Sequence, residues 1–132
     1  MSGKIELSIV LPVFNEEKNI PEVIKRFLEI SKKVNLEIIF VEDGGSVDNT
    51  REIIKKNSLK YDFIKPIFTD ERGYGISLYN GLKTAKGEFI GWTHADLQAN
   101  PLDAIKALKI IEKENFSKNI YIKGKRYGRP LF

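Results

Sequence analysis

The chain has 132 residues, a formal net charge of +4, 42% hydrophobic residues and 30% charged residues. A chain of this length builds one hydrophobic core, and its eight Phe and five Tyr supply enough apolar surface to exclude wholesale disorder. Zero cysteines and a single histidine exclude disulfides, iron–sulfur clusters, thiol nucleophiles and sites with several His ligands. The sequence pI of about 9.2 favours anionic ligands such as phosphates, although solubility alone also explains it.

Neither a membrane span nor a leader is expected from the sequence. Every apolar run is far shorter than the roughly 20 residues of a membrane-spanning helix. The first eight residues include Lys4 and Glu6 and lack the apolar core of a signal peptide. We therefore expect a cytoplasmic protein, with membrane association as a further possibility for the full-length protein.

Short apolar runs recur along the chain and predict strands. They cover residues 7–11 (ended by Pro12), 37–41, 63–68 and 88–92, with a weaker candidate at 120–122. Apolar runs of this kind are typical of parallel strands that are buried on both faces.

Helical patterns lie between these runs. In the first, Ile20, Val23, Ile24, Phe27 and Leu28 fall at spacings of three and four, and Pro21 suits the first turn. The other three patterns are a helix through Ile53 and Ile54 with Asp48 as its N-cap, a stripe of Ile76, Tyr79, Leu82 and Ala85 ended by Gly87, and a helix opened by Asn100 and Pro101 with Ile105, Leu108 and Ile111 facing inward.

This alternation of strands and helices predicts an α/β layered domain with a mostly parallel sheet flanked by helices. Ligands bind such sheets outside the carboxyl ends of the strands. The loops that matter are therefore 12–18, 42–48, 69–75, 93–100 and 123–132.

The first loop excludes the common nucleotide-binding motifs. It has no Gly-x-Gly-x-x-Gly and the chain has no Gly-Lys-Ser/Thr P-loop, so a Rossmann dinucleotide site is rejected. The loop offers the carboxylate of Glu16 and the ring of Phe14, which suit hydroxyl groups and an aromatic base. Alternatively, Asn15 and Glu16 only cap the first helix.

Asp43 directly follows a buried strand, at the ligand edge of the expected sheet. Gly44 and Gly45 after it permit a positive φ and a close approach of the backbone. A turn with a capping residue explains Asp48 well, but it explains Asp43 less well.

The fourth loop alternates polar and apolar residues. In extended backbone, His94, Asp96 and Gln98 share one face and could hold one divalent cation, and an imidazole ligand favours Mn²⁺ over Mg²⁺. Alternatively, His94 is a hydrogen-bonded residue at a strand end.

The last loop has four cationic side chains in residues 123–129. They either clamp phosphates or form a solvated basic tail. One short basic cluster is weak evidence for nucleic-acid binding.

Together these loops resemble the family 2 glycosyltransferases, which have the GT-A fold, and they look most like the dolichol- or polyprenyl-phosphate sugar synthases. The residues that carry the match are Ile9–Glu16, Asp43–Thr50, Gly73–Gly75, Asn80–Gly81, Ala85–Ile90, Ala95–Gln98 and Lys123–Tyr127. They occur in the order of the family and cover almost the whole chain.

The resemblance implies roles for these residues. Pro12, Phe14 and Glu16 would line the nucleotide pocket, with Glu16 on the ribose, and Asp43 would contact the base. Asp96 would hold a divalent cation, Mn²⁺ or Mg²⁺, on the donor diphosphate, and Gln98 would complete its shell. Arg126 would reach a phosphate, so that Asp96 and Arg126 are the expected catalytic residues.

The sequence departs from the family at two points. His94 stands at the first position of the Asp-x-Asp motif, which removes one negative charge. The family's catalytic domain also continues past the segment around Arg126, so we expect residues 1–132 to be a nucleotide-sugar-binding domain that is incomplete at its C-terminus.

The expected function is transfer of a sugar, with inversion, from a UDP- or GDP-sugar to an acceptor, for which polyprenyl phosphate is one candidate. A cation and a basic side chain would stabilise the departing diphosphate. The alternative is a non-catalytic fragment that binds a nucleotide sugar. A nucleotidyltransferase would need a glycine-rich loop after the first strand, and this chain has none there.

Overall fold

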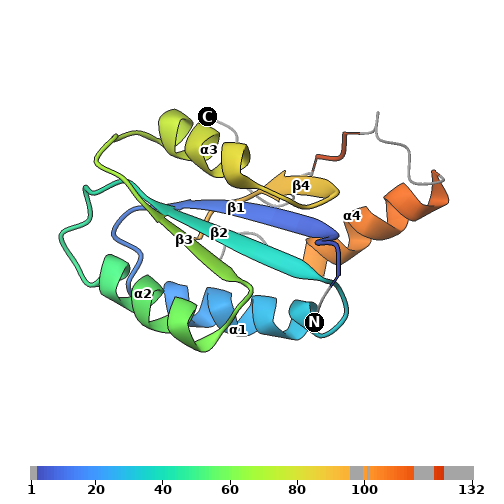
Figure 1. Cartoon of the computed structure of the whole chain (residues 1–132), viewed down its shortest axis with the longest axis horizontal. Coiled ribbons are helices and arrows are strands. Elements are labelled where there is room, and N and C mark those ends of the chain that lie inside the picture. The colour runs from blue at the N-terminus through green and yellow to red at the C-terminus, as the bar shows by residue number, and fades with distance from the viewer. Residues whose placement is uncertain (1–2, 96–99, 101, 115–120, 124–132) are drawn as a thin grey trace, which may run out of the picture.

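Strands and helices alternate along the chain in the computed structural model, which describes residues 3–95, 100, 102–114 and 121–123 (Figure 1). The strands are β1 (Leu7–Val13), β2 (Leu36–Glu42), β3 (Ile64–Phe68) and β4 (Phe89–Trp92). The helices are α1 (Ile20–Ser31), α2 (Thr50–Lys60), α3 (Tyr74–Thr84) and α4 (Leu102–Lys113).

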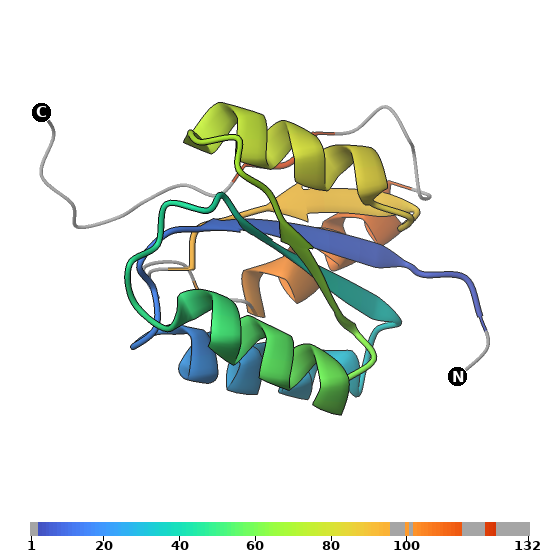
Figure 2. The same ribbon diagram turned by 60° about the vertical axis from the view of Figure 1, so that its left-hand side comes forward.

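The described strands form one parallel sheet in the order β3-β2-β1-β4, as the apolar runs predict. The chain steps outward from β1 to β2 and β3, then returns across the sheet to place β4 on the other side of β1. Since such crossovers are right-handed, this reversal puts α3 on the face opposite α1 and α2, as Figures 1 and 2 show. The reversal between β1 and β4 is a topological switch point, where open α/β sheets bind ligands.

The larger core lies between the sheet and α1. One face of β1 and β2 packs on the apolar stripe of α1, and α4 adds partly buried side chains to the same cluster. The residues at its centre are Leu11, Ile20, Phe27, Ile38, Phe40 and Ile54. The predicted inward face of α1 is confirmed from Ile20 to Phe27, whereas Leu28 is only partly buried. The predicted inward face of α4 is confirmed, with Ile111 buried and Ile105 and Leu108 packed against the core.

The smaller core lies between the other face of the sheet and α3, where Val10, Ile39 and Val41 meet Leu78 and Leu82. The predicted inward stripe of α3 is wrong in part, because Tyr79 is 57% exposed while Ser77 and Gly81 are buried. Small side chains face the sheet here because the helix lies close to it. The helix also ends at Thr84 with Ala85 as its C-cap, before the expected Gly87.

Three other local expectations need correction. β1 does not end at Pro12 but continues to Val13. The hydrogen-bonded pairing of β1 with β4 ends where the Val10 carbonyl accepts the Thr93 N–H. Pro12 lies beyond this point, so its lack of an N–H removes no hydrogen bond between the two strands.

The N-cap position of α2 is Asn49 rather than Asp48, although Asp48 Oδ1 does accept the Thr50 N–H at 3.0 Å. Of the weak strand candidate at 120–122, residues 121 and 122 have no regular structure, and residue 120 lies outside the described residues.

At the edge of the sheet where the strands begin, a buried polar group joins three segments. The Ser8 hydroxyl donates to Glu37 Oε2 at 2.6 Å, and the same oxygen accepts the Lys86 N–H at 2.7 Å. The Gly87 N–H donates to Ser8 Oγ at 2.8 Å, so this group fixes the turn between α3 and β4. None of the helices in the described segments is long and apolar enough to cross a membrane.

Candidate functional site

The loops that follow β1, β2 and β3 meet at one edge of the sheet, at the left in Figure 1. Pro12 of β1 is paired with Val41 of β2, and Val10 is paired with Trp92 of β4. The exits of β1, β2 and β4 are therefore neighbours, as the loop analysis predicts. We call the segments 14–17, 43–50, 69–74 and 93–95 at this edge the rim.

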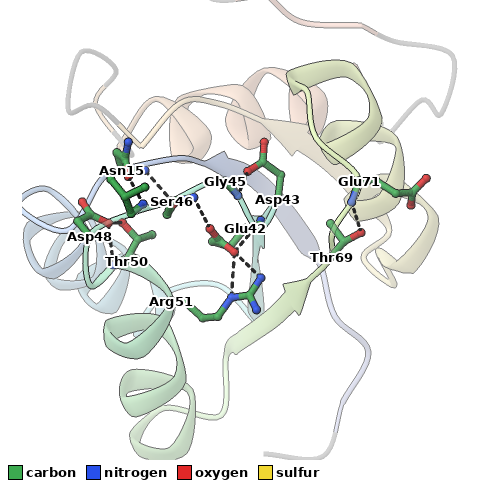
Figure 3. Close-up of polar contacts among 12 residues, drawn as sticks. Asn15, Glu42, Asp43, Gly45, Ser46, Asp48, Thr50, Arg51, Thr69 and Glu71 are labelled. Carbon is green, nitrogen blue, oxygen red and sulfur yellow. Dashed lines mark hydrogen bonds and ion pairs between the residues drawn. The ribbon is translucent and has the colours of Figure 1, made fainter.

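Asn15 and Ser46 join the first two loops of the rim (Figure 3). The Asn15 N–H donates to Ser46 Oγ at 2.9 Å, and Asn15 Oδ1 accepts the Val47 N–H at 2.8 Å. Asn15 has a φ of +49°, a left-handed conformation that Asn tolerates better than most residues. Both loops are thus fixed to each other by a reciprocal pair of hydrogen bonds.

A second set of bonds joins the same loops farther along. The Glu16 N–H donates to Thr50 Oγ1 at 2.8 Å, and the Glu17 N–H donates to Asp48 Oδ2 at 3.2 Å. Burial raises the pKa of Asp48, but hydrogen bonds from Thr50 and from the Glu17 N–H outweigh it and hold that pKa below its ordinary value of 3.8. Asp48 therefore has a structural role in the rim.

Glu42, at the end of β2, has a side chain that is only 1% exposed. Its Oε1 accepts from Arg51 Nε at 3.0 Å and Nη2 at 2.7 Å and from the Gly44 N–H at 2.9 Å, while Oε2 accepts the Ser46 N–H at 3.2 Å (Figure 3). Burial raises the pKa of this carboxyl, but the hydrogen bonds from Ser46, Arg51 and Gly44 outweigh it and hold the pKa below 4.5.

Asp43 connects the second and third loops of the rim. Its Oδ1 accepts the Gly45 N–H at 2.9 Å, and its Oδ2 accepts the Gly73 N–H at 3.3 Å. Gly44 has a φ of +83°, and a Cβ there would lie 2.7 Å from the Thr69 carbonyl oxygen, so the turn requires glycine. The half-buried carboxylate of Asp43 is the acidic group at the middle of the rim.

Phe14 and Gly45 lie against each other beside Asp43. The Phe14 ring is 53% exposed, and a Cβ at Gly45 would lie 2.9 Å from its Cε2 atom. The rim therefore presents an aromatic face next to a carboxylate. Pro12, predicted to line the same pocket, is partly buried at the end of β1.

Glu16 belongs to the part of the rim near Thr50 and is partly buried. Its Oε2 accepts from Asn19 Nδ2 at 2.8 Å, and its carbonyl oxygen accepts the N–H groups of Asn19 and Ile20. The N-cap of α1 is Asn19, so the backbone of Glu16 closes the turn before the helix, and the alternative that Asn15 and Glu16 cap this helix is wrong. Among the described residues, only Asn19 donates to the Glu16 carboxylate, which leaves it further acceptor positions.

His94 stacks on Tyr74 at the fourth loop, with ring centroids 5.2 Å apart and an interplanar angle of 28°. Tyr74 directly follows Gly73, whose N–H binds Asp43, so contacts run along the rim from Phe14 to His94. Asp96, Gln98 and Arg126 lie outside the described residues. Within the described ranges, no three His, Asp or Glu side chains are grouped as a metal site.

Sequence reasoning missed Glu42, Arg51 and Tyr74. The signal for Glu42 was its place directly beside Asp43 at the end of a buried strand. Tyr74 lies within the motif Gly73–Gly75, but the motif does not show its contact with His94, which is twenty residues away along the chain. Nothing local pointed to Arg51, whose partner Glu42 is nine residues away.

Comparison with solved structures defines the class of fold. The Staphylococcus aureus TarS structure (residues 1–349) in complex with UDP-GlcNAc matches with a TM-score of 0.73 and 27% identity, over 96% of this chain and 37% of that one. A Pyrobaculum calidifontis mannosyltransferase, PcManGT, in complex with GDP-Man and Mn²⁺, matches with a TM-score of 0.69 and 22% identity, over 83% of this chain and 33% of that one. The fold is that of the GT-A glycosyltransferases.

The family follows from the sequence. The profile of Glycosyl transferase family 2 matches residues 8–129, so this chain belongs to that family. It is 38% identical to a Bacillus subtilis protein, an uncharacterized glycosyltransferase named YkcC, over 100% of this chain and 41% of that protein. It is 36% identical to the bactoprenol glucosyl transferase of Shigella phage SfV, over 83% of this chain and 35% of that protein. The chain thus spans about two fifths of the length of these relatives.

Proposed function

We propose that this chain is the nucleotide-sugar-binding part of a glycosyltransferase that transfers a sugar from a nucleoside-diphosphate sugar to polyprenyl phosphate, with inversion. The observation that carries the proposal is the rim itself, where Phe14 and Asp43 lie side by side at the switch point of a GT-A sheet. Such a pair suits a planar base that has hydrogen-bond donors.

Four residues at the rim or next to it have proposed roles. The exposed face of Phe14 stacks on the base, with Pro12 beside it, and Asp43 accepts a hydrogen bond from a base N–H. The free acceptor positions of Glu16 bind ribose hydroxyls. UDP is the first nucleotide to test, because the TarS structure that matches this chain contains UDP-GlcNAc.

A divalent cation belongs to the same proposal. When bound, it neutralises charge on the departing diphosphate. The oxygen donors of Asp96 and Gln98 fit Mn²⁺ or Mg²⁺, and we assign the cation to them, with Arg126 on a phosphate. His94 lies against Tyr74, and its imidazole is the remaining candidate ligand from the sequence.

The acceptor is proposed from the relatives. Several are named for bactoprenol glucosyl transfer, and a Pseudomonas savastanoi relative at 31% identity is named undecaprenyl-phosphate 4-deoxy-4-formamido-L-arabinose transferase. A lipid phosphate oxygen is already anionic at neutral pH, so it can attack the anomeric carbon directly and needs no general base from the protein. Direct displacement inverts the anomeric configuration.

A second candidate is a module that binds the nucleotide sugar without turnover. It is favoured by His94, which stands at the first position of the Asp-x-Asp motif and removes one negative charge from the proposed cation site. The two candidates share the donor site and differ only in transfer.

Calorimetry tests the donor site first. We expect UDP to bind the chain more tightly with Mn²⁺ than without it. Asp43→Asn should weaken UDP about 10- to 100-fold, because it removes a charged hydrogen-bond acceptor. Asp96→Asn should abolish the Mn²⁺-dependent part of the affinity.

Asp62→Asn is the matched control, since the same change lies on an exposed residue at the opposite edge of the sheet. Equal affinities of the Asp43 and Asp62 variants would remove Asp43 from the site. Transfer of labelled sugar to polyprenyl phosphate then separates the two candidates: product supports the enzyme, and binding without product supports the module.

A further inference from the structure

Two adjacent carboxylates hold the start of the loop after β2. Glu42 accepts the N–H groups of Gly44 and Ser46, and Asp43 accepts the N–H of Gly45 between them. Successive backbone donors therefore alternate between the two side chains, which leave the strand on opposite sides (Figure 3). Because of this alternation, the loop cannot shift relative to one carboxylate without disturbing the other.

Glu42 is the firmly held member of this pair. Two nitrogens of Arg51, in the first turn of α2, donate to Oε1 of Glu42. The Arg51 guanidinium lies over the ring of Phe68, at the end of β3, 5.0 Å from its centroid. The carboxylate is thus fixed by a helix and two strands, which are the rigid elements around the loop.

Asp43, by contrast, is held by the loops. In the described part of the chain its side chain accepts hydrogen bonds from the backbone of Gly45 and Gly73. Its position therefore follows the conformation of segment 43–46, which Glu42 controls through Gly44 and Ser46.

We propose that Glu42 is a positioning residue for nucleotide binding: together with Arg51 it holds segment 43–46 so that Asp43 is presented to the base. This inference rests on the proposed function for the role of Asp43. It assigns Glu42 no contact with the nucleotide.

Glu37 offers a matched control within the same strand. It is also a buried carboxylate of β2, 3% exposed, and it also accepts a backbone N–H from a distant loop. It lies at the opposite end of the strand, beside Ser8. Glu37→Gln should therefore destabilise the fold without changing segment 43–46.

The first measurement needs no nucleotide. In Glu42→Gln the amide group has one acceptor oxygen and cannot serve all the donors that now surround it. Hydrogen exchange should become several-fold faster at Gly44 and Ser46, and also at Gly45 and Gly73, whose partner is Asp43. Glu37→Gln should leave exchange at Gly73 unchanged.

The second measurement is the affinity for UDP, taken well below the melting temperature of each variant. We expect Glu42→Gln to weaken UDP about tenfold, which is ~1.4 kcal/mol, and Glu37→Gln to leave its affinity unchanged. If Glu42→Gln fails to fold, Arg51→Lys gives the same two readouts with smaller changes, because it keeps the charge but loses the paired donors.

Unchanged exchange at Gly73, or an unchanged UDP affinity in a folded Glu42 or Arg51 variant, would overturn the inference. Loss of UDP affinity in both Glu42→Gln and Glu37→Gln would also overturn it, since the effect would then follow from general destabilisation. If the unmodified chain binds neither UDP nor GDP, the proposed function fails, and exchange at Gly73 alone decides whether Glu42 positions Asp43.

Discussion

Gly81 lies in α3 where this helix crosses β1 and β2. A Cβ at this position would overlap Val10 Cγ1 and would lie 3.0 Å from Val41 Cγ2. The absence of a side chain therefore sets how closely the helix approaches the sheet. This close approach also explains why the fully buried residues of α3, Ser77 and Gly81, are small.

Gly81→Ala should lower the free energy of unfolding by about 1–3 kcal/mol, because the methyl group overpacks the core between α3 and the sheet. Gly75→Ala in the same helix is the control, since a Cβ there would lie more than 4 Å from every other segment that the structure describes. That change should raise stability by up to about 1 kcal/mol, the gain in helix propensity. Urea denaturation of both variants measures the difference, and equal effects would show that Gly81 does not set the packing distance.

The position of His94 could be predicted from the sequence, but its contact with Tyr74 could not. Its place in the fourth loop was predicted from the run that precedes it, and the structure does put it just after β4. Its contact with Tyr74 depends on how α3 lies against the sheet. That arrangement is a property of the tertiary structure and leaves no local pattern.

The loop between β2 and α2 carries a pH dependence of stability. The pKa of Glu42 is lower in the folded chain than its ordinary value of 4.5. Between the two pKa values the unfolded chain is therefore protonated at Glu42 to a greater extent than the folded chain. The carboxylate therefore contributes stability above about pH 4.5, and this contribution is lost as the pH falls through the lowered pKa.

Glu42→Gln should cost about 1–3 kcal/mol near neutral pH, because hydrogen bonds to a charged group are lost. The difference from the unmodified chain should shrink as the pH falls below about 4.5. Urea denaturation at a series of pH values measures it. A difference that stays constant down to about pH 3 would show that the charge of Glu42 adds nothing to stability.

At the scale of elements, the sequence was most informative where one apolar stripe faces one core. The stripe of α1 is confirmed from Ile20 to Phe27, and the apolar runs located all four described strands. The predicted end of β1 at Pro12 and the predicted N-cap of α2 were less accurate. β1 continues past Pro12, which has no partner on β4 there. The N-cap of α2 is Asn49, although the side chain of the preceding residue, Asp48, accepts the Thr50 N–H. The predicted face of α3 was wrong in part, because Ser77 and Gly81 are buried beside Leu78 and Leu82 while Tyr79 is exposed.

At the scale of the whole molecule, the order of the strands brings the rim together. β1 lies between β2 and β4, so loops that are far apart in the sequence leave the sheet as neighbours. The position of Phe14 and Asp43 at one edge could be predicted from the alternation of elements alone. The hydrogen bonds that lock the loops, from Asn15 to Ser46 and from Glu42 to Arg51, could not, because they depend on loop conformation.

The central claim is that the rim is one nucleotide site, and an NMR titration of the isotope-labelled chain with UDP tests it most directly. We predict saturable shifts of the backbone amides in the rim segments 14–17, 43–46 and 73–74. Amides at the opposite edge, such as those of Leu36, Ile64 and Gly87, should not move. The absence of saturable shifts, or shifts centred on that opposite edge, would contradict the claim.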